Sequence, residues 1–274
     1  MALGVHRLMV PRPPARHAFC AWEGPIAMAH RGFSATPELA GLENSLPAFA
    51  AAVELGYRYL ETDVRATADG ELLAFHDERL DRVTDLRGEL ARTPWAQVRR
   101  ARIAGREPVP RLEDVLGSFP QARFNLDVKT TSAIPGLDAV LRRTRAHGRV
   151  LVTAFAEDRR RAALTAVGGA EATSASSRST ALALVGTGLR TPPLVRRALA
   201  GVDAVQVPVR QNGVEVVSRR FVDAVHGAGA QVHVWTVDDA VQIGALLDLG
   251  VDGIITDRAD VLREVLLARG EWSS

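Results

Sequence analysis

Two histidines and a pair of carboxylates stand in short motifs suited to acid–base and cation chemistry. His30 lies in AHRGF and His76 in FHDE, while ETD places Glu61 and Asp63 two residues apart. Residues two apart in an extended strand point to the same face, so Glu61 and Asp63 should project together. Two histidines beside such carboxylates could act as general base and general acid, because the pKa of imidazole lies near the working pH.

The segment FNLDVK supplies a third carboxylate and the only lysine of the chain. Asp127 and Lys129 are also two residues apart and should share a face. Three carboxylates that meet repel one another unless a cation neutralises them. Hard oxygen ligands suit Mg2+ or Ca2+. We therefore expect a divalent cation, Mg2+ or Ca2+, near Asp127 and the pair Glu61 and Asp63.

Short apolar runs recur along the chain, and each is followed by an amphipathic segment. Continuous apolar strands that alternate with helices are typical of a parallel sheet covered on its outer face. Eight such units in 274 residues predict a (β/α)8 TIM barrel. The expected strands are 26–30, 59–64, 123–129, 150–155, 171–176, 204–209, 231–237 and 253–257, with helices near 45–55 and 135–147 and one helix between 176 and 200.

In such a barrel the reactive groups lie at the carboxyl ends of the strands. His30 and Arg31 end the first strand, Trp235 ends the seventh and Asp257 ends the eighth. Three of them have an ordinary alternative: His30 as a structural histidine, Trp235 as a core tryptophan, and Asp257 as an aspartate that only caps the last helix. Their placement at the same end of successive strands favours a shared site.

About sixty residues, 65–122, separate the second strand from the third and predict a small insertion on a barrel loop. The insertion opens on Asp69-Gly70, a signal for a two-residue hairpin turn. Such a turn pairs 68 with 71 and therefore places His76 opposite Asp63. The hairpin would thus bring His76 to the cation site, facing His30.

The sequence predicts one domain preceded by a short extension. Residues 1–24 form an N-terminal extension, whose short apolar stretch and the prolines that follow it argue against a signal peptide. Residues 25–274 form a single domain that includes the insertion. Nothing in the sequence predicts an oligomeric state.

Composition excludes several classes of protein. A hydrophobic content of 47%, a charged content of 24% and a net charge of +2 are typical of a globular protein. The chain has no basic block with interleaved aromatic residues, so we expect no nucleic-acid binding. Its apolar runs fall short of the ~20 residues that span a bilayer, so we expect no stable membrane insertion. The single cysteine, Cys20, excludes an internal disulfide and indicates a reducing, cytoplasmic location.

Six motifs, in this order, resemble the glycerophosphodiester phosphodiesterase family. They are AHRGF, ENSLPAFAAAVELG, ETDVRATADGELLAFHDERLDRVTD, FNLDVK, HVWTVDD and GVDGIITDRAD, and the match runs from about Ile26 to Leu267. The resemblance implies a TIM barrel with a small insertion after strand 2. It also implies metal-dependent hydrolysis of glycerophosphodiesters, which are small molecules, to an alcohol and glycerol 3-phosphate.

The resemblance also assigns roles to residues. It makes His30 and His76 the acid–base pair, Glu61, Asp63 and Asp127 the metal ligands, and Arg31 and Lys129 the phosphate-binding residues, with Glu43 beside the metal or the glycerol hydroxyls and Trp235 in the pocket wall. Asp127 stands where the family usually has glutamate, which leaves the choice between Mg2+ and Ca2+ open. Leu42 replaces the usual proline, and Ser45 replaces a common threonine.

Three alternatives stay open at this point. A lysophospholipase D or sphingomyelinase D-like phosphodiesterase would be favoured by a larger apolar rim around Trp235 and Phe155. A catalytically silent barrel that binds phosphodiesters would not need both histidines and every metal position. A phosphosugar-binding barrel would not need His30 and His76 together with three carboxylates.

Overall fold

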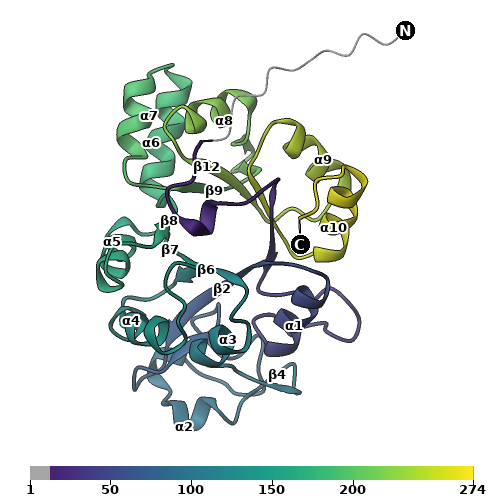
Figure 1. Cartoon of the computed structure of the whole chain (residues 1–274). Coiled ribbons are helices and arrows are strands. Elements are labelled where there is room, and N and C mark those ends of the chain that lie inside the picture. The colour runs from purple at the N-terminus through teal and green to yellow at the C-terminus, as the bar shows by residue number, and fades with distance from the viewer. Residues whose placement is uncertain (1–12, 274) are drawn as a thin grey trace.

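A computed structural model describes residues 13–273, and eight parallel strands form a barrel wall surrounded by helices (Figure 1). The wall strands are β1 (Ile26–His30), β2 (Tyr59–Ala66), β6 (Arg123–Val128), β7 (Val150–Thr153), β8 (Ala172–Thr173), β9 (Ala204–Pro208), β12 (Gln231–Trp235) and β13 (Gly253–Thr256). Their spatial order is β8-β7-β6-β2-β1-β13-β12-β9. The prediction of a TIM barrel is confirmed, and all eight wall strands lie where the apolar runs predict them.

The barrel closes at its shortest strand, β8. Ser174 and Ala204 form a parallel bridge there. The Ala175 amide donates to the Ala204 carbonyl at 2.8 Å, and the Asp203 amide donates to the Thr173 carbonyl at 2.8 Å. These bonds join β8 to β9 and satisfy the edges that an open sheet would expose.

Helices cover the outer face of the barrel, as the alternating pattern predicts. They are α1 (Leu46–Glu54), α3 (Leu112–Ser118), α4 (Ile134–Arg143), α5 (Glu157–Ala166), α6 (Ser177–Gly188), α7 (Pro192–Ala198), α8 (Arg219–His226), α9 (Ala240–Asp248) and α10 (Ala259–Ala268). Within residues 13–273, none of the helices combines the length and apolarity needed to cross a bilayer.

Two helices, α6 and α7, stand where the sequence analysis expected one. The α6 helix ends at Gly188, and α7 begins with Pro192 at its first position. Proline cannot continue a preceding helix but suits the first turn of a new one. The proline pair therefore divides this segment.

The insertion after β2 begins with a hairpin whose loop is one residue longer than predicted. The Thr67 amide donates to the Glu71 carbonyl at 3.0 Å, so the loop contains three residues, 68–70. Gly70 has a φ of +86°, the left-handed conformation that ends three-residue hairpin loops. The sequence could not distinguish this loop from the two-residue turn, because both kinds of loop place glycine at a position with positive φ.

The longer loop changes the register of β2 and β3 (Leu72–Ala74). Val64 lies opposite Ala74, and the Phe75 amide donates to the Asp63 carbonyl at 2.9 Å. The predicted pairing of His76 with Asp63 is therefore wrong by one residue. Since β3 ends at Ala74, His76 is free of strand alternation and still turns toward the barrel mouth.

The rest of the insertion is a small lobe with its own core. It contains the 3-10 helix η2 (Leu90–Arg92), α2 (Trp95–Val98) and the pair β4 (Arg102–Ile103) and β5 (Glu107–Pro108). Its core contains Leu73, Phe75, Leu80, Leu90, Val98, Ala101, Ile103 and Val109, together with Leu42 from the segment that precedes α1. In Figure 1, α2 and β4 lie at the outer edge of the molecule, away from the barrel wall.

The described part of the N-terminal extension, 13–24, packs against the barrel through the 3-10 helix η1 (Ala18–Cys20). Phe19 is fully buried in a cluster with residues from several wall strands. Its carbonyl accepts a hydrogen bond from the Tyr59 hydroxyl at 2.6 Å, and the Cys20 carbonyl accepts one from Gln231 Nε2 at 3.1 Å. The segment therefore contributes to the core; residues 1–12 lie outside the described part of the chain.

Candidate active site

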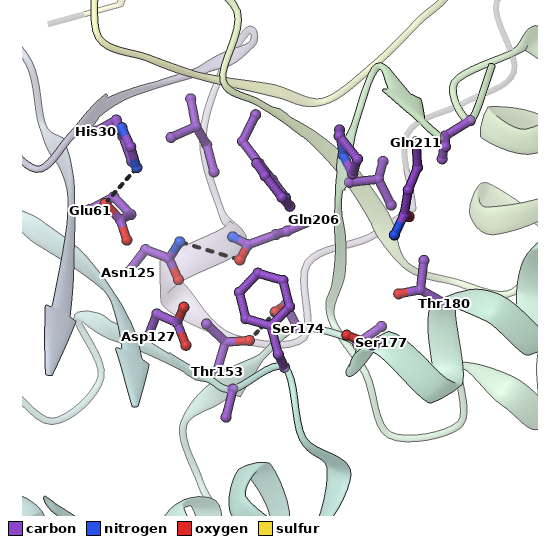
Figure 2. Close-up of a pocket in the computed structure, with 18 of the residues that line it drawn as sticks. His30, Glu61, Asn125, Asp127, Thr153, Ser174, Ser177, Thr180, Gln206 and Gln211 are labelled. Atoms are coloured by element: carbon purple, nitrogen blue, oxygen red, sulfur yellow. Dashed lines mark hydrogen bonds and ion pairs between the residues drawn. The ribbon is translucent and has the colours of Figure 1, made fainter. Parts of the chain in front are cut away.

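A cavity of about 760 Å³ opens at the carboxyl ends of the strands, a size typical of small-molecule sites (Figure 2). Eight of the nine site residues expected from the sequence line it: His30, Arg31, Glu61, Asp63, His76, Asp127, Lys129 and Trp235. Glu43 does not line it. The structure thus brings together residues from β1, β2, β6, β12 and the insertion.

His30, the last residue of β1, is held by carboxylates from the strands on both sides. Its Nδ1 donates to Asp257 Oδ1 at 2.7 Å, and its Nε2 lies 3.8 Å from Glu61 Oε2. Burial alone would lower the pKa of His30, but the hydrogen bond to Asp257 and the charge of Glu61 raise it above its ordinary value. Donation from Nδ1 fixes the ring and leaves Nε2 for chemistry in the cavity.

His76, in the insertion, is held by a carboxylate in a similar way. Its Nδ1 donates to Asp77 Oδ1 at 2.7 Å. Arg82 Nε donates to the other oxygen of Asp77 at 2.5 Å, and this bond is the main reason that the pKa of Asp77 falls to about 2. Asp77 therefore stays ionised, and the His76 ring is oriented in the same way as His30.

The sequence analysis assigned no site role to Asp77, and it offered helix capping as the ordinary role of Asp257. In the structure the N-cap of α10 is Arg258, and Asp257 accepts from His30 instead. The acid that follows His76 in the motif FHDE was the available signal for Asp77. No local signal connects Asp257 with His30.

Glu61, Asp63 and Asp127 face the same cavity, as strand alternation predicts. Asp63 and Asp127 are direct neighbours across β2 and β6. Lys129 Nζ lies 2.9 Å from Asp63 Oδ1 and 2.6 Å from Asp127 Oδ2. Arg31 Nε lies 3.1 Å from Asp63 Oδ2. Side-chain cations thus pair with both aspartates.

Asn44 is a further site residue that the sequence analysis did not assign. Its side chain is buried, and its backbone has the left-handed conformation, with a φ of +57°. Its Nδ2 donates to Asp63 Oδ2 at 3.0 Å, and its Oδ1 accepts from Thr62 Oγ1 at 2.7 Å. The contact fixes Asp63, and the asparagine of the motif ENS was the available signal.

Glu43 lies behind Arg31 rather than in the cavity wall. It accepts from Arg31 at 2.9 Å and from both terminal nitrogens of Arg82, at 2.8 and 2.6 Å. Arg82 also binds Asp77, so Glu43 connects Arg31 with the residues that orient His76. Glu43 therefore holds Arg31 and Arg82 in place without facing the cavity.

The turn after His30 depends on a glycine. Arg31 has a φ of +52° and Gly32 a φ of +83°. A Cβ on Gly32 would lie 2.7 Å from the backbone carbonyl carbon of Ala48 in α1. The glycine of HRG therefore lets the backbone of this turn pack closely against α1. In this arrangement Arg31 lies beside Asp63.

The donor chemistry of the cavity fits a hard divalent cation. Asp127 Oδ1 and Asn125 Oδ1 are buried and accept no hydrogen bond within residues 13–273. Burial, together with the charge of Asp63, raises the pKa of Glu61 to about 7, as expected where buried carboxylates face one another. Among the described residues, no group of three or more His, Cys, Asp or Glu side chains is arranged to hold a metal ion as it stands.

Two aromatic side chains border the mouth of the cavity. Phe155 and Trp235 make an edge-on contact, with ring centroids 6.0 Å apart and an interplanar angle of 80°. Lys129 Nζ lies 5.4 Å from the centroid of Phe155. Phe155 is 50% exposed, so the rim is partly apolar.

Comparison with known proteins agrees with this geometry. A model described as the glycerophosphoryl diester phosphodiesterase family matches residues 30–261. The chain is 45% identical, over 91% of its length and 93% of the relative, to a probable glycerophosphodiester phosphodiesterase 2 from Mycobacterium tuberculosis.

Solved structures at lower identity show the same fold. A putative glycerophosphoryl diester phosphodiesterase from Silicibacter pomeroyi superposes with a TM-score of 0.75 at 21% identity, covering 92% of this chain and 96% of that one. An Oleispira antarctica phosphodiesterase, solved in complex with the product sn-glycerol-3-phosphate, gives a TM-score of 0.72 at 21% identity, covering 89% and 97%.

Proposed function

The chain belongs to the glycerophosphoryl diester phosphodiesterase family, and we propose that it hydrolyses glycerophosphodiesters to an alcohol and glycerol 3-phosphate by histidine acid–base catalysis with a divalent cation. One observation carries the proposal. Two cavity-lining histidines each donate from Nδ1 to a carboxylate at 2.7 Å, which leaves each Nε2 for proton transfer.

The two histidines divide the proton transfers. One removes the proton from the nucleophile, which is water or the glycerol 2-hydroxyl. Attack by the 2-hydroxyl gives a cyclic phosphate, and water then opens this ring to glycerol 3-phosphate. The other protonates the departing alkoxide. Asp257 and Asp77 orient the rings and stabilise whichever imidazolium forms.

Glu61, Asp63 and Asp127 are the residues that would hold the cation, because they are hard oxygen donors on one cavity wall. A bound divalent cation supplies charge neutralisation at the phosphoryl oxygens. Arg31 and Lys129 are the side chains available to hold the phosphate, and both are already directed into this wall by their ion pairs with Asp63.

The chemistry at Lys129 should require an ammonium group rather than any cation. Lys129 is partly buried between two aspartates, with Nζ 2.9 and 2.6 Å from their oxygens. A guanidinium is wide, flat and forked, so it would reach further and displace one of them. Lys129→Arg should therefore lose activity about as severely as Lys129→Met, by at least about tenfold, with the loss mainly in kcat.

Steady-state kinetics of the two Lys129 variants would check this expectation, with thermal unfolding as the control for folding. Retention of more than about half of the wild-type kcat/KM by Lys129→Arg would show that the site needs only a positive charge at this position, since an effect so small lies well under the ~1.4 kcal/mol that marks a tenfold change.

The reaction itself is tested by incubating the purified full chain with a set of glycerophosphodiesters and measuring release of glycerol 3-phosphate. Release from at least one diester is expected. Hydrolysis of lysophospholipids alone, giving lysophosphatidic acid, would instead support a lysophospholipase D, for which the half-exposed Phe155 is the relevant feature. Binding of diesters without any hydrolysis would indicate a silent barrel.

We also place the enzyme in a reducing compartment, the cytoplasm. Cys20 is the only cysteine of the chain, and it is buried. Burial raises the pKa of its thiol to about 12, so thiolate chemistry is suppressed. This thiol is therefore a core side chain and not part of a disulfide framework.

A further inference from the structure

The cavity has two ends of different chemistry. The reactive end, formed by β1, β2, β6 and the insertion, carries the histidines and the three carboxylates. The far end is formed by α6 and by the hairpin of β10 (Arg210–Gln211) and β11 (Val214–Glu215). Figure 2 shows Ser177, Thr180 and Gln211 on the side of the cavity away from His30 and Glu61.

Charge is distributed unevenly between the two ends. Among the described residues that line the cavity, every carboxylate belongs to the reactive end, and Arg210 is the charged side chain of the far end. Arg210 is exposed. Glu215 lies opposite Arg210 in the hairpin but does not line the cavity and makes no ion pair with it. The far end therefore presents an available guanidinium among neutral polar groups.

The aromatic side chains Phe155 and Trp235 at the cavity mouth do not provide a binding site for a cationic alcohol. Recognition of a quaternary ammonium group relies on open aromatic faces without a competing cation. Here Lys129 Nζ already lies 5.4 Å from the Phe155 centroid, and the Trp235 ring packs edge-on against Phe155. A choline or ethanolamine cation at this rim would meet Lys129 on one side and Arg210 beyond it.

The two parts of a glycerophosphodiester differ in how much they vary. The glycerol hydroxyls always lie on the second and third carbons from the ester oxygen, where Asn125 and the carboxylates of the reactive end can accept from them. The leaving alcohol varies in length and charge, and it extends away from the reactive end. With the phosphate at the reactive end, its outer part would lie toward α6 and the hairpin.

We propose that the far end is a leaving-group subsite that selects alcohols bearing an anionic group, a carboxylate above all, over cationic alcohols, with Arg210 as the specificity-determining residue. Ser177 and Thr180 of α6 and Gln211 of the hairpin supply neutral hydrogen bonds around the same group. This inference rests on the proposed function, because it assigns a substrate preference to that reaction.

Glycerophosphoserine and glycerophosphoethanolamine form a matched pair of substrates, since they differ only by one carboxylate. With the full chain and divalent cation, kcat/KM measured by glycerol 3-phosphate release should favour the serine diester by about fivefold, the upper range for a solvent-accessible ion pair. Arg210→Gln should bring the ratio of the two kcat/KM values close to one, mainly through KM.

Arg178→Gln is the matched control, because Arg178 lies on α6 but does not line the cavity. It makes the same change in net charge and should keep the wild-type ratio. A wild-type ratio of one or below, or a ratio unchanged in Arg210→Gln, overturns the subsite while leaving the hydrolysis intact. Failure of the wild type to cleave either diester overturns the inference, and failure to cleave any glycerophosphodiester overturns the proposed function as well.

Discussion

Replacement of His30 or His76 by alanine should lower kcat for glycerophosphodiester hydrolysis by at least about 10²-fold, the usual worth of a positioned proton donor or acceptor. Both rings line the cavity, and both are oriented through Nδ1 by a carboxylate at 2.7 Å. Alanine removes the proton-transferring nitrogen in each case. The loss corresponds to about 2.7 kcal/mol of transition-state stabilisation.

His147→Ala provides the control for this experiment. His147 Nδ1 donates to Glu171 Oε1 at 2.7 Å, so it has the same kind of partner, but it does not line the cavity. Its loss should leave kcat near the wild-type value even where thermal stability falls. Near-wild-type turnover by His30→Ala or His76→Ala, with a normal unfolding transition, would remove that histidine from the mechanism.

Removal of divalent cations by EDTA should abolish hydrolysis, and Mg2+, Ca2+ or Mn2+ should restore it. Glu61, Asp63 and Asp127 share one cavity wall, and one oxygen of Asp127 is buried without a hydrogen-bond partner among residues 13–273. A hard cation would satisfy this oxygen and offset the repulsion between the carboxylates. The order in which the three ions restore activity will identify the preferred one.

Thermal unfolding gives a second readout that does not depend on activity. A ligand that binds the folded state raises the melting temperature by mass action. The restoring cation should therefore stabilise the wild type and should stabilise Asp127→Asn less. Asp138→Asn is a suitable control, since Asp138 lies on α4 outside the cavity. Full activity after thorough chelation would show that the three carboxylates have another role.

Much of the fold and many of the site residues could be predicted from the sequence, because both depend on patterns that span only a few residues. Alternation places Glu61 beside Asp63 on one face, and each apolar run followed by an amphipathic segment predicts one strand and one helix. Every wall strand lies where such a run predicts it. Eight of the nine site residues expected from the sequence and from the family resemblance line one cavity.

Tertiary structure decided the partners of those residues. Asp257 reaches His30 only because β13 lies beside β1, although the two residues are 227 positions apart. Arg82 connects Asp77 with Glu43 only because the insertion lies against the segment that precedes α1. The hairpin register followed the choice between two loop lengths that one glycine permits equally well. Strand period and turn chemistry are encoded locally, whereas contacts between distant side chains depend on closure of the barrel, and no short stretch of sequence contains that information.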